Sequence, residues 1–190
     1  VYIRLIHSVL AKGKTALVLV PEIALTPQLL ALFSAQFGDE IALLHSMLPA
    51  GERYDEWKRV RSGRARVVVG TRSAIFAPLN QLGLIILDEE QESSYKSEST
   101  PRYHARDIAK YRAAHTGSLL LLGSATPSLE SMYHARQGAY HLFSLRQRYN
   151  QKALPKVIIS DMKEALRSGS DAILGTELVG ELRKNLDTGE

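Results

Sequence analysis

The chain has 190 residues, of which 45% are hydrophobic and 23% charged, a composition typical of a globular protein rather than a disordered or fibrous one. Lys and Arg outnumber Asp and Glu by 24 to 20, a small excess that favours a polyanionic partner. The absence of cysteine excludes disulfides and cysteine-ligated zinc within this sequence and suits a reducing compartment, and the apolar runs are far shorter than the ~20 residues of a membrane helix.

Apolar runs of strand length alternate with segments of helical periodicity. We expect strands at residues 16–20, 41–44, 66–69, 84–87, 118–122 and 157–160, and helices at residues 26–37, 51–61, 104–115 and 128–136. Because the strand runs are continuously apolar, both faces of the sheet should be buried. The pattern predicts an α/β fold, a parallel sheet with helices on both faces, whose ligands bind beyond the carboxyl ends of the strands.

The polar segment Arg146–Pro155 interrupts this alternation. We expect one domain at residues 1–150, followed by a linker and the start of a second domain at residues 151–190. The sequence begins at Val1, without Met and without the zones of a secretory signal. We therefore expect it to be part of a longer protein.

Gly13-Lys14-Thr15 matches the last three positions of the phosphate-binding motif G-x-x-x-x-G-K-[ST]. Ser8 stands where the motif requires its first glycine, and the triplet precedes a predicted strand instead of following one. A phosphate-binding loop follows a strand and opens a helix. We predict a helix end and a polar turn here rather than a nucleotide site.

Two adjacent carboxylates, Asp88 and Glu89, follow the predicted strand at residues 84–87. In nucleotide hydrolysis one such carboxylate holds Mg²⁺ and its neighbour orients the attacking water. We interpret Asp88 as the magnesium ligand and Glu89 as the catalytic carboxylate. The alternative is a solvated acidic turn that caps a helix.

Small hydroxyl residues follow the next predicted strand, in the segment Gly123–Ser128. Ser124, Ala125 and Thr126 would stand beside the acidic turn, where the hydroxyls can bond to its carboxylates and link the nucleotide state to movement of a neighbouring domain. The alternative is that Thr126 or Ser128 only caps the next helix. An acidic strand end and a Ser-Ala-Thr strand end are together more specific than either alone.

Two other strand ends carry residues suited to a nucleic-acid backbone. Thr26 and Gln28 follow the first predicted strand, and Gly70-Thr71-Arg72-Ser73 follows the third. Hydroxyls and backbone N–H groups at helix starts, with the Arg72 guanidinium, can contact phosphates. The alternative is two ordinary capped turns.

Aromatic and basic residues interleave in the segment after the carboxylates, at Tyr95, Lys96, Arg102, Tyr103 and His104. Rings that stack on bases beside cations that attract phosphates are typical of single-strand binders. We predict that this loop contacts DNA, and the alternative for Tyr103 is packing in the core.

These segments, with Leu44-His45-Ser46 and Ile159-Ser160-Asp161-Met162, occur in the order found in superfamily 2 helicases. More narrowly, the sequence resembles the bacterial primosomal replication-restart helicases over about residues 1–165. The segments Gly70–Pro78 and Thr100–Asp107 carry most of the specificity, because they are not general helicase signatures.

The resemblance implies a RecA-like lobe of a cytoplasmic, bacterial helicase that uses ATP and Mg²⁺ to move 3′ to 5′ along DNA. Its implied partners are single-stranded and forked DNA, primosome proteins and single-strand DNA-binding protein, with no membrane. Asp88 and Glu89 keep the roles given above, Ser124 to Thr126 correspond to the coupling motif, and residues 94–104 resemble a loop that senses DNA.

The resemblance also has departures. The phosphate-binding loop of the family is expected upstream of Val1, and its zinc-binding insertion and most of the second lobe are expected elsewhere in the intact protein. We therefore expect zinc in the intact protein but not in this chain, and no ATP hydrolysis by these 190 residues alone. Gln91 stands where many relatives have His, which is expected to alter the coupling.

Two other functions remain open at this point. The chain can be a degenerate RecA-like lobe that serves as a non-catalytic platform for DNA or protein. It can also be an unrelated doubly wound enzyme acting on a nucleotide or sugar phosphate, since a fold alone does not define a function. The second alternative explains the sheet and one acidic turn but not the ordered series of strand ends.

Overall fold

The chain divides into two units, Val1–Leu142 and Phe143–Glu190. The structure, a computed structural model, describes residues 1–145, 157–159, 161–163 and 174–188. The predicted boundary segment Arg146–Pro155 lies outside the described residues.

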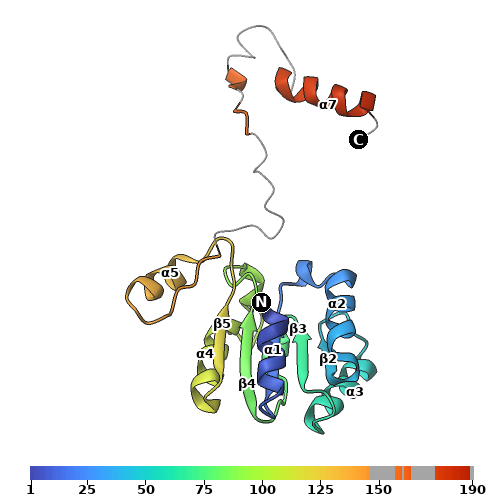
Figure 1. The fold of residues 1–190 in the computed structure, drawn as a ribbon, viewed down its shortest axis with the longest axis vertical. Helices are drawn as coiled ribbons and strands as arrows, with labels where there is room; N and C mark the ends of the chain where they lie inside the picture. The colour runs from blue at the N-terminus through green and yellow to red at the C-terminus, as the bar shows by residue number, and fades with distance from the viewer. Residues whose placement is uncertain (146–156, 160, 164–173, 189–190) are drawn as a thin grey trace. The chain divides into compact units, whose positions relative to one another are not determined.

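The apolar runs of the first unit form one five-stranded parallel sheet among the described residues (Figure 1). Its order is β2-β3-β1-β4-β5, and its strands are β1 (Thr15–Leu19), β2 (Ile41–Leu44), β3 (Val67–Gly70), β4 (Leu82–Leu87) and β5 (Leu119–Leu122). Every residue of the central strand β1 is buried, because strands flank it on both sides and helices cover both faces. This arrangement confirms the predicted fold class.

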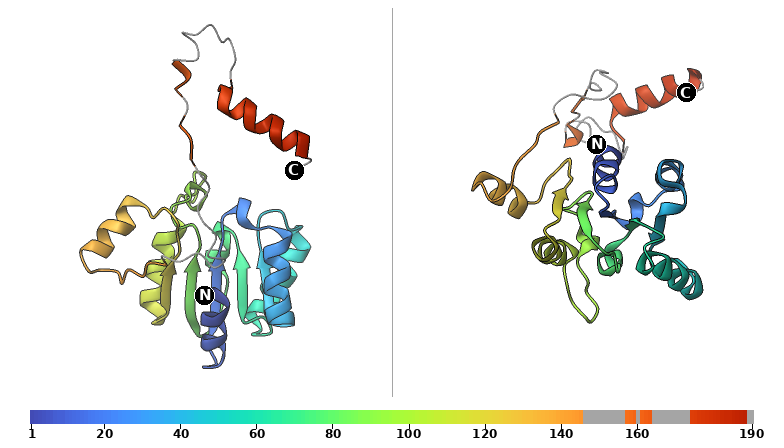
Figure 2. Two further views of the ribbon diagram at one scale, coloured as in Figure 1. Left: turned by 45° about the horizontal axis from the view of Figure 1, so that its top comes forward. Right: turned by 60° about the horizontal axis from the view of Figure 1, so that its bottom comes forward.

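Helices cover the two faces of the sheet in pairs. One face carries α1 (Tyr2–Leu10) and α2 (Pro27–Phe37), and the other carries α3 (Ala50–Arg61) and α4 (Ala105–Thr116) (Figure 2). Successive side chains of β1 enter different layers: Ala16 and Val18 pack with α1 and α2, whereas Leu17 and Leu19 pack on the opposite side. The helix α5 (Leu129–Arg136) follows β5.

The helix before the Gly13 turn was expected through its end alone, a helix in the second unit was not expected from the sequence, and one expected strand is wrong where it is described. Helix α1 buries Ile6 and Leu10 against the sheet, and α7 (Thr176–Thr188) forms in the second unit. The strand predicted at residues 157–160 is not formed by residues 157–159, which are exposed and pair with no described strand. Ser160 is outside the described residues.

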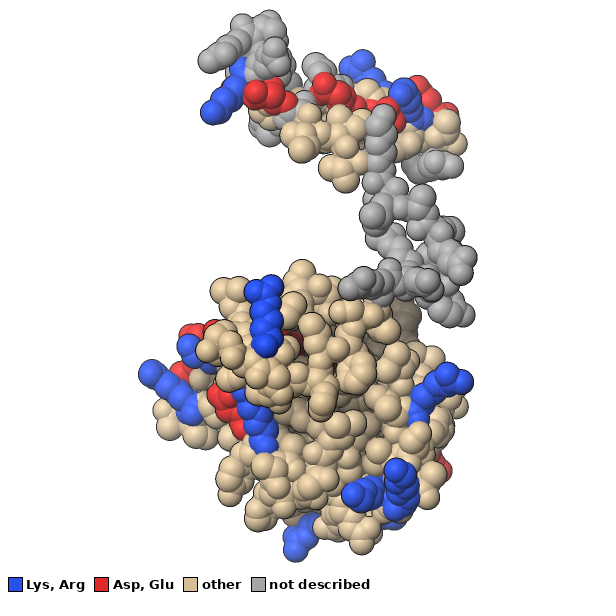
Figure 3. All heavy atoms as spheres, turned by 60° about the vertical axis from the view of Figure 1, so that its left-hand side comes forward, with Lys and Arg blue, Asp and Glu red and all other residues tan. Residues whose placement is uncertain are grey.

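The distribution of basic side chains on the surface does not by itself identify a ligand-binding site. On the face drawn in Figure 3, the Lys and Arg side chains of the described residues are scattered and form no continuous stripe. In the part of the chain that the structure describes, no helix has the length and apolar character needed to cross a bilayer.

Candidate functional site

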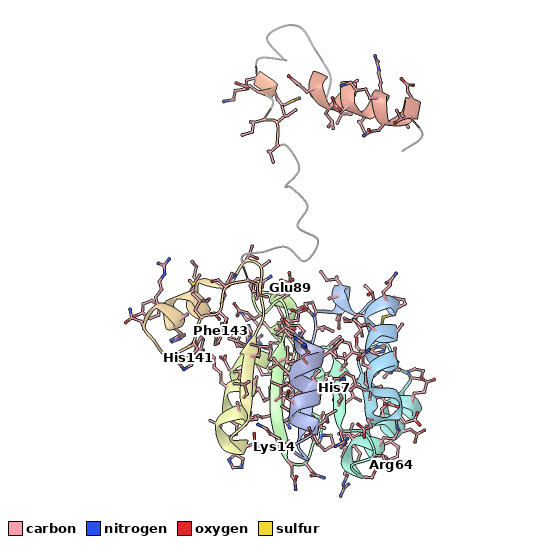
Figure 4. All side chains as sticks on the ribbon, viewed as in Figure 1. His7, Lys14, Arg64, Glu89, His141 and Phe143 are labelled. Atoms are coloured by element: carbon pink, nitrogen blue, oxygen red, sulfur yellow. The ribbon has the colours of Figure 1, made fainter. Side chains whose placement is uncertain are left out.

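The end of β1 and the segments that follow β4 and β5 meet at the carboxyl edge of the sheet. The Asp88 N–H donates to the Leu19 carbonyl at 2.9 Å, the Gly123 N–H to the Leu87 carbonyl at 2.8 Å, and the Glu90 N–H to the Gly123 carbonyl at 3.0 Å. These bonds continue the sheet ladder beyond the strands. They hold the acidic turn, residues 88–91, against the segment that follows β5, and Figure 4 shows Glu89 at this edge.

Two tyrosine hydroxyls hold Asp88. Tyr2, at the start of α1, donates to the carboxylate Oδ1 at 2.6 Å, and Tyr95 donates to the Asp88 backbone carbonyl at 2.7 Å. Burial, followed by interactions with Asp88, raises the pKa of both phenols above the usual range for tyrosine. Both hydroxyls therefore remain donors at neutral pH and fix the position of Asp88.

Gly123 leaves the space through which Tyr2 reaches Asp88. A Cβ at this position would lie 2.0 Å from the Tyr2 hydroxyl oxygen and 3.2 Å from Asp88 Oδ1. A side chain here would displace the hydrogen bond between the two residues. The glycine before the Ser-Ala-Thr segment is thus part of the site for a steric reason.

Glu89 is linked to the Ser-Ala-Thr segment through Gln91. Gln91 Nε2 donates to Glu89 Oε2 at 2.9 Å, Ser124 Oγ donates to Gln91 Oε1 at 2.5 Å, and Ser124 Oγ accepts from the Thr126 N–H at 2.9 Å. The sequence predicts that the hydroxyls of this segment bond to the carboxylates. In the structure the Gln91 amide stands between them, and Ala125 lies exposed in the same turn.

The site also contains a buried ion pair that the sequence does not predict. Glu90 is 2% exposed and pairs with Arg106, the two groups being 2.8 Å apart. Burial by itself would raise the pKa of Glu90, but hydrogen bonds from Ser128, Arg106 and Ser131 lower it below the ordinary value. No local sequence pattern relates positions 90, 106 and 128, so only the fold could reveal this cluster.

The residues predicted to contact DNA after β1 and β3 have different surroundings. Thr26 caps α2 by accepting from the Leu29 N–H at 3.3 Å, whereas Gln28 and Ser73 are exposed. Thr71 is buried at 3% exposure. A Cβ on Gly70 would lie 2.1 Å from the Leu44 carbonyl oxygen, so this glycine permits close approach of β2 and β3.

Arg72 binds the neighbouring loop in this structure. Its Nη1 donates to the Ser94 carbonyl at 3.2 Å and to the Lys96 carbonyl at 2.6 Å. Its guanidinium carbon lies 5.9 Å from the centroid of the Tyr103 ring. The group predicted to hold a phosphate is therefore engaged with residues 94–103.

The loop predicted to contact DNA has a buried and an exposed part. Tyr95 is 1% exposed, so its predicted role in base stacking does not agree with its position in the core. Tyr103 is partly buried and packs edge-on against Phe76, with ring centroids 5.0 Å apart. Lys96 and Arg102 are exposed, and with Tyr103 and His104 they line a surface depression of about 590 Å³.

His104 has a structural role at the start of α4. Its Nδ1 accepts from the Arg106 N–H at 3.2 Å. Burial, and then the nearby Arg106 charge, lower the pKa of His104 below its ordinary value. The neutral ring is thus the form that caps the helix.

The Gly13-Lys14-Thr15 turn lies at the other end of the sheet. Lys14 precedes β1, and Figure 4 shows it at the end of the sheet opposite Glu89. Gly13 has a φ of 71°, and Thr15 pairs with Leu82 at the start of β4. The expected turn between a helix and a strand is confirmed.

The acidic turn suits a magnesium ion that is bound together with a nucleotide. Among the described residues, no group of three or more His, Asp or Glu side chains could hold a metal ion. Mg²⁺ usually takes one or two protein carboxylates and completes its shell with phosphate and water. Asp88, with Glu89 adjacent, matches that donor set.

Comparison with known proteins defines the class. Residues 1–134 match the DEAD/DEAH box helicase family. The chain therefore belongs to this family, and its parallel sheet is that of a RecA-like lobe.

Particular relatives are similar over the full length of the chain. It is 50% identical over 190 residues to the replication restart protein PriA of Bacillus subtilis (strain 168), covering 24% of that protein. It is 47% identical over 190 residues to the PriA of Treponema pallidum (strain Nichols), covering 28%, and 42% identical over 190 residues to the PriA of Haemophilus influenzae, covering 26%. The chain thus spans about a quarter of the length of these curated relatives.

Proposed function

We propose that the chain is the first motor lobe of a replication-restart helicase that hydrolyses ATP and moves 3′ to 5′ on DNA. The observation that carries this proposal is the hydrogen-bonded series Glu89–Gln91–Ser124 at the carboxyl edge of the sheet. It supplies a physical path from a carboxylate suited to hydrolysis to a segment suited to coupling. The similarity to PriA proteins over the whole chain supports the same function.

In this proposal the two carboxylates act on a nucleotide bound at their edge of the sheet. A bound Mg²⁺–ATP would supply the phosphoryl group and the cation charge. Asp88, oriented by Tyr2 and Tyr95, would hold the metal. Glu89 would orient the attacking water, as a carboxylate does in phosphoryl transfer, and the Gln91 amide would restrain its Oε2.

The loop at residues 93–104 would be the DNA side of the lobe. The exposed Lys96 and Arg102 can attract the phosphate backbone of single-stranded or forked DNA, and Tyr103 can offer part of its ring to a base. Arg72 would hold the loop in place rather than contact phosphate. Primosome proteins and single-strand DNA-binding protein are proposed partners in the bacterial cytoplasm.

The test is ATP hydrolysis by the full-length protein that carries this segment, measured with and without single-stranded DNA. Glu89→Gln should lower kcat at least about 100-fold, the scale of losing a group that activates water. Glu130→Gln, at an exposed carboxylate on α5, is the matched control and should keep the wild-type rate. Equal rates for the two variants would remove Glu89 from the catalytic role, and a wild-type protein without turnover would favour a binding platform.

A further inference from the structure

Glu90 and Arg106 form an ion pair that is almost fully removed from solvent. The side chains are 1% and 13% exposed, and Arg106 Nη1 lies 2.8 Å from Glu90 Oε2. A buried carboxylate is stable only when charges and hydrogen bonds replace the lost water. Glu90 meets this condition through Arg106 and through two serines of another element.

The serines belong to the start of α5. Glu90 Oε1 accepts from the Ser128 N–H at 2.7 Å, and Oε2 accepts from the hydroxyls of Ser128 at 3.2 Å and Ser131 at 2.9 Å. The Glu90 carboxylate therefore caps α5, which favours a negative charge at its amino end. Its backbone N–H also holds the Gly123 carbonyl.

Arg106 joins the same cluster from the start of α4. Its Nη1 donates to the Ser128 hydroxyl at 2.7 Å and lies 3.3 Å from the Ser131 hydroxyl, in addition to its contact with Glu90. The residue stands two positions after His104, where the loop at residues 93–104 passes into α4. The position of this guanidinium is thus fixed to the end of the loop.

Three functional segments consequently meet at one ion pair. Glu90 directly follows Glu89, Arg106 follows the loop, and Ser128 follows the Ser-Ala-Thr segment. Displacement of either charged group would leave the other buried without its partner. The three segments are therefore held to one arrangement, or they must rearrange together.

We infer that Glu90 and Arg106 are a positioning pair that makes the placement of Glu89 and Ser124 depend on the conformation of the loop at residues 93–104. The inference rests on the proposed function, because it concerns how DNA at the loop stimulates ATP hydrolysis. Neither side chain is assigned a contact with nucleotide or DNA. Both act through the segments to which they are bonded.

The experiment compares ATP hydrolysis with saturating single-stranded DNA and without DNA, in the full-length protein. Glu90→Gln and Arg106→Gln should each lower the ratio of the two rates at least about fivefold, the lower end of typical coupling between sites. The variants should lower the DNA-stimulated kcat more than they change the KM for ATP. Glu130→Gln and Arg136→Gln, both at exposed positions of α5, should leave the ratio unchanged.

Two further variants separate positioning from stability. The double variant Glu90→Gln/Arg106→Gln has no unpaired buried charge, so its melting temperature should recover while the rate ratio stays low. Ser131→Ala keeps both charges and removes one hydrogen bond to Glu90, so it should fold and show a smaller loss of the ratio.

The outcomes distinguish the inference from the function on which it rests. The inference is overturned if the ratio of the hydrolysis rates with and without DNA is unchanged in the single variants or in Ser131→Ala. It is also overturned if this ratio recovers together with the melting temperature in the double variant. A wild-type protein without DNA-dependent hydrolysis overturns the proposed function, and the inference with it.

Discussion

The Tyr95 hydroxyl donates a 2.7 Å hydrogen bond to the backbone carbonyl of Asp88. Tyr95 belongs to the short 3₁₀ turn Ser93–Tyr95, at the beginning of the loop proposed to meet DNA, and its ring is 1% exposed. The bond joins that loop to the residue proposed to hold magnesium. Tyr95 is therefore part of the support of the acidic turn.

Removing this hydroxyl should destabilise the fold. Tyr95→Phe keeps the buried ring but leaves the Asp88 carbonyl without its donor, which should lower the free energy of unfolding by about 1–3 kcal/mol. Tyr111→Phe is the control, because Tyr111 is 71% exposed and should change stability by less than about 0.5 kcal/mol. Urea unfolding of both variants measures the difference, and equal midpoints would contradict the role given to Tyr95.

Gly123 should not tolerate even a methyl group while Tyr2 keeps its hydroxyl. The Cβ of Gly123→Ala would lie 2.0 Å from that oxygen, and overpacking of this kind costs about 1–3 kcal/mol. Tyr2→Phe removes the obstructing atom, so the double variant should be more stable than the sum of the single changes predicts. Gly51→Ala serves as the control, because no atom lies within 4 Å of its new Cβ. Strict additivity of the two changes in Gly123→Ala/Tyr2→Phe would refute the steric account.

The sequence predicted the sheet and the acidic edge because those features depend on local patterns. Continuous apolar runs indicate buried parallel strands, and Asp88 and Ser124 each stand directly after such a run. The pairing of Glu90 with Arg106 and the burial of Tyr95 depend on how distant segments pack. For that reason the sequence places Tyr95 among the residues that contact DNA, although its side chain lies in the core.

Arg72 and Arg102 should differ in their effect on DNA binding. Arg102 is exposed, so Arg102→Ala should reduce the slope of log binding constant against log salt by about 0.7, the value for one phosphate contact on a single strand. Arg72 donates to the Ser94 and Lys96 carbonyls, so Arg72→Ala should leave the slope unchanged and increase amide exchange in residues 93–104. A lower slope for Arg72→Ala would restore its predicted role as a phosphate ligand.

His104 should make the stability of the chain depend on pH. Burial and Arg106 lower its pKa, so the unfolded chain binds the proton more readily and stability falls as the pH drops below about 6.5, the ordinary value. Arg106 and Lys110 oppose the protonated ring, whereas Asp107 and Glu90 favour it.

His104→Asn isolates this contribution, because asparagine keeps an acceptor at the helix start and does not titrate. Unfolding in urea from pH 8 to pH 5 should show a steeper loss of stability for the wild type than for His104→Asn. Parallel curves would mean that His104 titrates alike in the folded and unfolded chain.

The most direct test of the central claim is phosphate release from ATP, measured for the 190-residue chain and for the full-length protein with single-stranded DNA. Lys14 lies at the end of the sheet opposite Glu89 (Figure 4), so we do not expect it to hold a nucleotide phosphate beside that carboxylate. We predict no turnover by the 190-residue chain, and in the full-length protein a rate that Glu89→Gln lowers at least about 100-fold and Lys14→Ala leaves unchanged. Turnover by the 190-residue chain that is lost on Lys14→Ala would place the nucleotide at the opposite edge of the sheet and contradict the account.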